Sequence, residues 1–197
     1  MWRAGSREAG RELVRRHFDR LHRFFSALTP AHADDLTQDT FEAFLHRKDG
    51  DAPADVRAYL MGIARNKALM YWRSHARRRD RPADFELDSV EDLEETPTQI
   101  QARTEDQRLL LRALRGIPLE AQILLQLYYW EGMTGPELAR FFATTDLAIR
   151  HRIRRAKELL SQRLAAAAAD PDARRTTADN LDRWVLSVRA HAEPRRG

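Results

Sequence analysis

The chain has 197 residues, enough for one domain of medium size or two small ones. Its formal net charge is +4, and the absence of cysteine excludes a disulfide framework and a thiolate metal site. The sequence has neither the apolar core of a signal peptide nor the roughly 18 apolar residues in a row that a membrane span needs, so we expect a cytoplasmic protein.

Apolar residues recur at helical spacing through the first 79 residues. They predict helices over residues 7–28, 33–47 and 55–77, with a loop rich in Gly, Pro and Asp before the third. In the third helix we expect an inward face made of Val56, Tyr59, Leu60, Ile63, Ala64 and Met70.

Charge separates the chain into blocks. Residues 1–79 hold 16 Lys or Arg against 10 Asp or Glu, residues 80–104 hold 2 against 8, and residues 105–164 hold 10 against 7. Two basic blocks separated by an acidic segment predict two modules joined by a linker. The acidic segment contains two prolines, which indicate that the linker is extended. Basic blocks favour polyanions such as nucleic acid, although solvated surface charge explains the composition equally well.

The second module is predicted to be helical over residues 105–115, 119–130, 135–142 and 146–164. No alternating strand pattern occurs, so we expect an all-α fold of two small helical domains joined by an acidic linker. The extension, residues 165–197, contains a short apolar stripe from Leu181 to Val188. This stripe is compatible with a helix packing on the second module, with disorder, or with a regulatory contact.

A helix-turn-helix is predicted within the second module. Thr134 and Glu137 have the spacing of a capping box, and Thr145 is placed to cap the second helix of the motif. Ala143 occupies the turn position where such motifs commonly have glycine, at a cost of ~1 kcal/mol if a positive φ is kept.

The second helix of this motif has an apolar back, formed by Ile149, Ile153, Ala156 and Leu160. Its other faces carry a cationic set: Arg150, His151, Arg152, Arg154 and Arg155. This division is what a recognition helix needs to enter the major groove of DNA. A helix with a solvated basic face is the alternative.

Two further sets lie in the first module. One face of its second helix is acidic, with Asp35, Gln38, Asp39 and Glu42 at helical spacing, and such a face favours a basic protein surface over DNA. The third helix interleaves aromatic, amide and cationic side chains: Tyr59, Arg65, Asn66, Lys67, Tyr71, Arg73, Arg77 and Arg78. Aromatic rings can stack on unpaired bases while cations follow the phosphate backbone. For Tyr59 a core position is equally compatible with the pattern, and Trp72 fits the core better.

Three segments together resemble the extracytoplasmic-function sigma factors of bacterial RNA polymerase, a branch of the sigma-70 family. Residues 33–45, ADDLTQDTFEAFL, resemble the acidic helix of that family's second region. Residues 56–79 resemble its next helix, with the Ile-Ala-Arg-Asn core at residues 63–66. Residues 117–142 resemble the opening of its fourth region, and the resemblance covers about residues 10–164. The turn FATT departs from the family's usual Leu-Gly-Ile-Ser.

The resemblance implies a role for each part. Residues 1–79 would bind core polymerase through the acidic face, and would open and bind the −10 promoter element through the third helix. Residues 80–104 would thread through the RNA exit path, although a solubilising tether explains their charge almost as well. Residues 105–164 would bind the −35 element, with Thr145 and the cationic set of its recognition helix at the DNA. Core polymerase, promoter DNA and an anti-sigma factor are the implied partners.

The sequence contains no nucleophile–base constellation and no metal-ligand spacing, and its seven histidines are scattered. We therefore expect no enzyme activity, no metal and no cofactor. A stand-alone helix-turn-helix regulator is one alternative, but it leaves the acidic helix without a role. A helical interaction protein that does not bind DNA is another, but it leaves the cationic set unexplained.

Overall fold

The computed structural model describes four stretches of the chain: residues 7–46, 53–78, 104–167 and 180–192. Regular secondary structure in these stretches is helical throughout, so the all-α prediction is confirmed. The chain divides into two compact units between residues 83 and 84, called unit 1 and unit 2 below. Apart from Thr104, the predicted linker lies outside the described residues.

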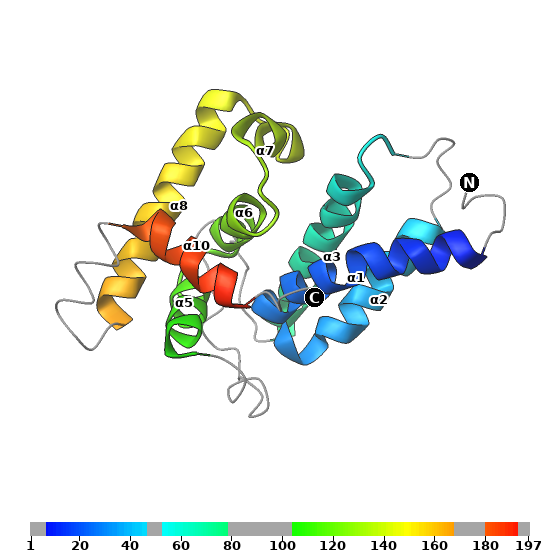
Figure 1. The fold of residues 1–197 in the computed structure, drawn as a ribbon, viewed down its shortest axis with the longest axis horizontal. Helices are drawn as coiled ribbons and strands as arrows, with labels where there is room; N and C mark the ends of the chain where they lie inside the picture. The colour runs from blue at the N-terminus through cyan, green and yellow to red at the C-terminus, as the bar shows by residue number, and fades with distance from the viewer. Residues whose placement is uncertain (1–6, 47–52, 79–103, 168–179, 193–197) are drawn as a thin grey trace. The chain divides into compact units, whose positions relative to one another are not determined.

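Among its described residues, unit 1 contains three long helices and one short 3-10 turn (Figure 1). In chain order they are α1 (Arg7–Leu28), η2 (Pro30–His32), α2 (Ala33–Leu45) and α3 (Val56–Arg78). The three long helices pack against one another in pairs. Their common core is formed by bulky side chains, among them Leu21, Phe24, Phe25, Leu28, Phe41, Phe44, Leu60, Met61 and Trp72. This core holds α2 beside α3 and leaves the polar face of each open to solvent.

The predicted inward face of α3 is partly wrong. Leu60 and Ala64 are buried, but Met70 is 65% exposed. Met70 follows Asn66 by four residues and precedes Arg73 by three, and both of these are exposed, so helical geometry puts Met70 on the outer face. Tyr59 is 36% exposed, and its ring meets that of Phe44 edge-on with centroids 5.8 Å apart. Tyr59 therefore lies at the edge of the core rather than inside it.

Unit 2 contains five helices among its described residues (Figure 1). They are α5 (Glu105–Arg115), α6 (Leu119–Tyr129), α7 (Gly135–Phe141), α8 (Asp146–Ala167) and α10 (Leu181–Ala192). α8 packs against α5, α6 and α7. α6 is buried along most of its length, which accounts for its run of leucine and isoleucine.

Local side-chain chemistry fixes where these helices begin and end. At the start of α5, the Thr104 hydroxyl accepts from the Gln107 N–H at 3.3 Å, and the Gln107 side chain accepts from the Thr104 N–H at 3.1 Å. This reciprocal capping box satisfies two backbone donors that have no partner within the helix. After α6, Gly132 has a φ of +63°, a left-handed conformation that glycine adopts without steric cost.

Of the alternatives for residues 165–197, the structure shows a packed helix. Leu181, Val185 and Val188 of α10 are buried, as their i, i+4, i+7 spacing requires of one inward face. α10 packs against α5. The extension therefore contributes a helix to the core of unit 2.

Candidate protein and nucleic-acid interfaces

The predicted acidic face of α2 is open to solvent. All four of its members, Asp35, Gln38, Asp39 and Glu42, are exposed. The Gln38 amide donates to the Glu42 carboxylate at 2.9 Å, which holds these two side chains together along the helix. The opposite side of α2 buries Thr37, Thr40, Phe41 and Phe44, so packing fixes which way the carboxylates point.

Asp39 is joined to the neighbouring helix by an ion pair. The Lys67 ammonium of α3 lies 3.2 Å from the Asp39 carboxylate. The Lys67 side chain is 24% exposed, whereas that of Asp39 is 54% exposed. Lys67 was predicted to contact DNA and Asp39 to contact a protein, so the structure brings together one residue from each predicted set.

The outer face of α3 presents an exposed stripe made of Asn66, Met70, Arg73 and Arg77. Spacings of four, three and four residues align them along one side of the helix. The Arg77 Nε donates to the Arg73 carbonyl at 3.4 Å, and Arg77 as a whole is exposed. Sequence reasoning missed Met70 as a member of this stripe because it assigned apolar residues to the core.

Other members of the predicted α3 set lie on the flanks of the helix. The centroid of the Tyr71 ring lies 5.1 Å from that of the His32 ring and 5.3 Å from that of the Trp72 ring. Tyr71 is therefore part of an aromatic cluster, and it is only partly exposed. Arg65 is partly buried as well. Arg78 is exposed and its guanidinium donates to the Ser74 hydroxyl at 3.5 Å. Trp72 is buried, in agreement with its expected core position.

In unit 2, α7 and α8 are joined by a short turn, residues 142–145. The Glu137 carboxylate accepts from the Thr134 N–H at 2.7 Å and from the Thr134 hydroxyl at 2.8 Å, which anchors the start of α7. The Thr145 hydroxyl accepts from the Ala148 N–H at 3.2 Å, the N-cap predicted for α8. Within the turn, Ala143 has a φ of 49°, so this alanine keeps the left-handed geometry expected of glycine.

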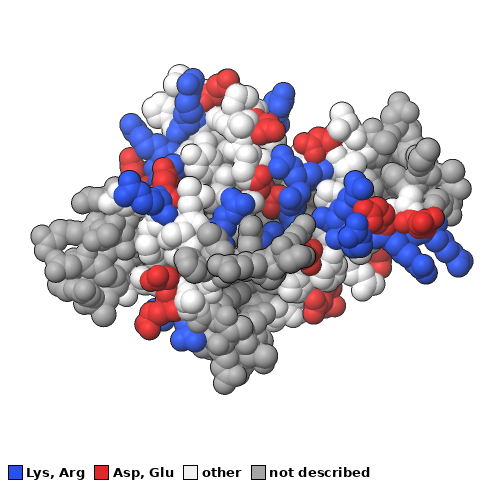
Figure 2. All heavy atoms as spheres, in the orientation of Figure 1, with Lys and Arg blue, Asp and Glu red and all other residues white. Residues whose placement is uncertain are grey.

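The predicted cationic set of α8 is exposed in full. It comprises Arg150, His151, Arg152, Arg154 and Arg155. On the opposite side Ile149, Ala156 and Leu160 are buried against the rest of unit 2, and Ile153 is partly buried. Figure 2 shows Lys and Arg side chains projecting from the region of α8. We call this set, together with Thr145, the α8 cationic face.

Glu158 limits the charge at one end of this face. Its carboxylate lies 3.5 Å from the Arg154 guanidinium and 3.7 Å from that of Arg155. The Arg154 side chain is nevertheless 73% exposed, and exposed pairs of this length are worth little, so both guanidinium groups can exchange Glu158 for another anion.

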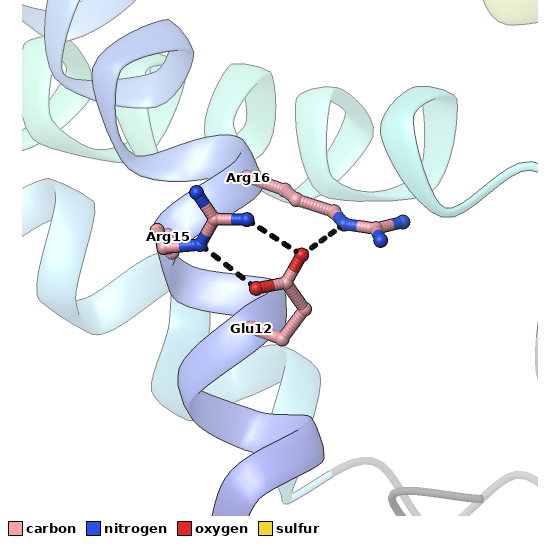
Figure 3. A network of polar contacts seen from close by, with 3 residues as sticks. All are labelled: Glu12, Arg15 and Arg16. Atoms are coloured by element: carbon pink, nitrogen blue, oxygen red, sulfur yellow. Dashed lines mark hydrogen bonds and ion pairs between the residues drawn. The ribbon is translucent and has the colours of Figure 1, made fainter.

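A second arginine cluster lies on α1 and did not belong to any predicted site. The Glu12 carboxylate accepts hydrogen bonds from Arg15 at 2.8 and 3.0 Å and from Arg16 at 2.5 Å (Figure 3). These bonds lower the pKa of Glu12 to about 2. Spacings of three and four residues on a helix are the sequence signal for such a network.

Sequence reasoning also missed the polar contacts that hold α10 on unit 2. The Tyr129 hydroxyl at the end of α6 donates to the Asp182 carboxylate. The Lys157 ammonium of α8 lies 2.8 Å from the same carboxylate and 4.6 Å from the centroid of the Tyr128 ring. The Arg189 guanidinium donates to the Tyr129 carbonyl at 2.7 Å. Asp182 and Arg189 are seven residues apart, which is about two helical turns. Both residues that make these polar contacts therefore lie along the same edge of α10.

Burial and the Asp182 carboxylate together raise the pKa of Tyr129, so its hydroxyl remains a hydrogen-bond donor at neutral pH. Partial burial raises the pKa of Asp182, but the hydrogen bonds from Lys157 and Tyr129 outweigh it, and the pKa lies below the ordinary value. Asp182 is therefore a carboxylate in the folded protein at neutral pH.

Within the described stretches, no group of three or more His, Asp or Glu residues is arranged to hold a metal ion. Among the described helices there is also none that is both long and apolar enough to cross a membrane.

Residues 13–78 match the family model described as sigma-70 region 2, which covers most of α1 and all of α2 and α3. The probable RNA polymerase sigma factor RfaY of Xanthomonas campestris is 29% identical over 68% of this chain and 34% of its own length. The ECF RNA polymerase sigma factor SigE of Mycolicibacterium smegmatis is 30% identical over 78% of this chain and 61% of its own length. The chain thus spans between about a third and three fifths of these curated relatives.

A solved structure has the same fold. It is the sigma factor RpoE from Bartonella quintana in complex with the anti-sigma factor NepR, with a TM-score of 0.60 and 22% sequence identity. The match covers 78% of this chain and 95% of that one. Residues 13–78 thus match sigma-70 region 2, and over most of its length the chain is similar to RNA polymerase sigma factors, one of them of the extracytoplasmic-function (ECF) branch.

Proposed function

We propose that this protein is a promoter-specificity subunit: it binds core RNA polymerase and directs it to promoters. The observation that carries the proposal is in unit 1, where the part of the chain that matches sigma-70 region 2 presents two exposed faces of opposite charge. One is the acidic face of α2 and the other is the basic stripe of α3. A carboxylate-rich face repels DNA, so it needs a different, basic partner.

The acidic face is proposed to dock on a basic surface of core polymerase. Asp35 and Glu42 are exposed at its two ends, and Asp39 between them keeps more than half of its side chain in solvent. Polar contacts at such an exposed face contribute to orientation and association rate more than to affinity.

The stripe of α3 is proposed to bind the −10 element. Arg73 and Arg77 supply charge for a phosphate backbone, and Asn66 supplies an amide that can donate to and accept from a base edge. Tyr59 is exposed enough to stack on an unpaired base. Tyr71 and Arg65 are less accessible, so their proposed share in this contact is smaller.

Unit 2 is proposed to bind the −35 element through the α8 cationic face. The capped start of α8 and its buried apolar back support this proposal, because together they hold the helix rigidly with its basic side outward.

Because the protein itself carries no proposed catalytic group, RNA synthesis belongs to the polymerase. The proposed location is the cytoplasm. An anti-sigma factor is a further proposed partner, because RpoE of Bartonella quintana is bound to NepR in its structure.

Promoter-dependent run-off transcription with purified bacterial core polymerase tests this proposal. Specific initiation that requires the added protein supports it. Tight binding to duplex DNA without any transcription would instead favour a stand-alone regulator. Neither activity, with retained folding, would favour a helical interaction protein.

A further inference from the structure

We propose that Lys67 acts as an internal counter-ion of Asp39, which core polymerase must displace, and that this displacement frees Lys67 to bind promoter DNA. The inference rests on the proposed function of unit 1 and concerns how its two binding faces are coupled. Its basis is the ion pair of 3.2 Å that joins the acidic face of α2 to the basic helix α3.

The two members of the pair differ in how open they are. The Asp39 carboxylate can be approached from solvent, since its side chain is 54% exposed. The Lys67 ammonium is the more covered partner, at 24%. An incoming cation therefore meets Asp39 first, and it competes directly with Lys67 for the same oxygens.

The chemistry of the pair favours exchange with an arginine. Lys67 makes one hydrogen bond to a single Asp39 oxygen, Oδ2. A guanidinium can make two parallel bonds to a carboxylate, a geometry that an ammonium cannot match. The partner surface that fits Asp39 is thus one that supplies an arginine, and its binding leaves Lys67 without its anion.

A released Lys67 lies close to the proposed path of the DNA. It is adjacent in sequence to Asn66 and three residues before Met70, both of which belong to the exposed stripe of α3. Its four-carbon chain lets the ammonium turn from α2 toward a phosphate that follows this stripe. In the free protein Asp39 and Lys67 form an ion pair with each other. In the complex with polymerase and promoter, Asp39 pairs with an arginine of polymerase and Lys67 pairs with a DNA phosphate.

Such an exchange couples the two partners thermodynamically. Polymerase binding increases the affinity of unit 1 for DNA, and DNA binding increases its affinity for polymerase by the same factor. Exposed ion pairs have modest free energies, so the expected factor is about two- to five-fold.

The test measures the affinity of the full-length chain for core polymerase without DNA, comparing the wild type with Lys67→Met. Methionine removes the charge and retains an unbranched stem. The expected result is that Lys67→Met binds core about two- to five-fold more tightly, because Asp39 no longer has an internal competitor. Lys67→Arg, which retains a cation for Asp39, should bind core no more tightly than the wild type.

Lys157→Met is the matched control. Lys157 is also paired with an aspartate, Asp182, and its side chain is 22% exposed, but it lies in unit 2. It should show no tightening. When the assembled holoenzyme binds promoter DNA, the slope of log affinity against log salt should be smaller in magnitude for Lys67→Met, by the release of about one counterion.

Equal or weaker core binding by Lys67→Met, or equal tightening by Lys157→Met, overturns the inference while leaving the proposed function intact. Failure of the wild type itself to bind core polymerase would instead remove the proposed function, and this measurement comes first.

Discussion

Replacing Asp182 by alanine tests whether the C-terminal helix α10 is fastened to unit 2 by the contacts seen here. The substitution removes the acceptor of the Tyr129 hydroxyl and the anion of Lys157 in a single step. The Tyr129 side chain is buried, so its hydroxyl has little access to water as a replacement partner.

The expected loss of stability follows from these two contacts. A hydrogen bond to a charged group contributes about 1.5–3 kcal/mol. The ion pair adds only about 0.2–1 kcal/mol, because the Asp182 side chain is 58% exposed. Asp182 lies in the first turn of α10, where a carboxylate suits the helix dipole, so alanine brings no compensating gain in helix propensity. We therefore expect a net loss of about 2–4 kcal/mol, confined to unit 2.

Calorimetric unfolding of the full chain measures this loss. For a unit of this size the transition of unit 2 should fall by roughly 4 °C per kcal/mol, while that of unit 1 stays in place. The neighbouring, exposed Arg183 supplies the control, because Arg183→Ala leaves the contacts of Asp182 intact. An Asp182→Ala midpoint equal to that of Arg183→Ala would refute the attachment.

The pH dependence of the same variant has a definite sign. The pKa of Asp182 is lower in the folded protein than the ordinary value of about 4, so its contribution is complete above that value. The contribution is lost as the pH falls through the folded-state pKa. The stability gap between wild type and Asp182→Ala should therefore close in acid, and a constant gap would contradict the role of the charge.

Three further predictions concern other parts of the chain. Arg154→Ala should lower the slope of log affinity against log salt for promoter binding by about 0.9 if its guanidinium contacts a phosphate, and an unchanged slope would exclude that contact. Ala143→Gly should stabilise unit 2 by about 0.5–1 kcal/mol in denaturant unfolding, because glycine adopts the positive φ of this turn without strain, and a destabilised variant would mean that the turn is not left-handed. NMR titration should give Glu12 a pKa of about 2, and neutralising both Arg15 and Arg16 with glutamine should return it toward the ordinary value; a wild-type value near 4 would show that the network is absent in solution.

The helices could be predicted from the sequence because the information for them is local. Repeats of three and four residues define a buried stripe, as in α8, and short-range pairs such as Thr145 with Ala148 define where a helix begins. The same logic predicted the exposed acidic and cationic faces. Met70 was misplaced because its apolar character was given more weight than its spacing from exposed Asn66 and Arg73.

Contacts between helices could not be predicted in the same way. Asp39 and Lys67 are 28 residues apart, and Tyr129 and Asp182 are 53 apart. Which flanks of two helices meet depends on how their cores interlock, and this packing is a property of the folded unit rather than of a short segment. The sequence shows that these charged and polar residues are present, but only the structure shows which of them pair.

The acidic face of α2 is proposed to bind core polymerase, and the α8 cationic face is proposed to bind promoter DNA. The most direct test measures the affinity of two variants for each of these partners. Asp39→Arg and Arg154→Ala are compared with the wild type for binding to core polymerase and for binding of the purified chain to promoter duplex. We predict that Asp39→Arg weakens core binding but retains duplex affinity, and that Arg154→Ala retains core binding but weakens duplex binding. Loss of both affinities in either folded variant, or of neither in Asp39→Arg, would contradict the assignment of these surfaces.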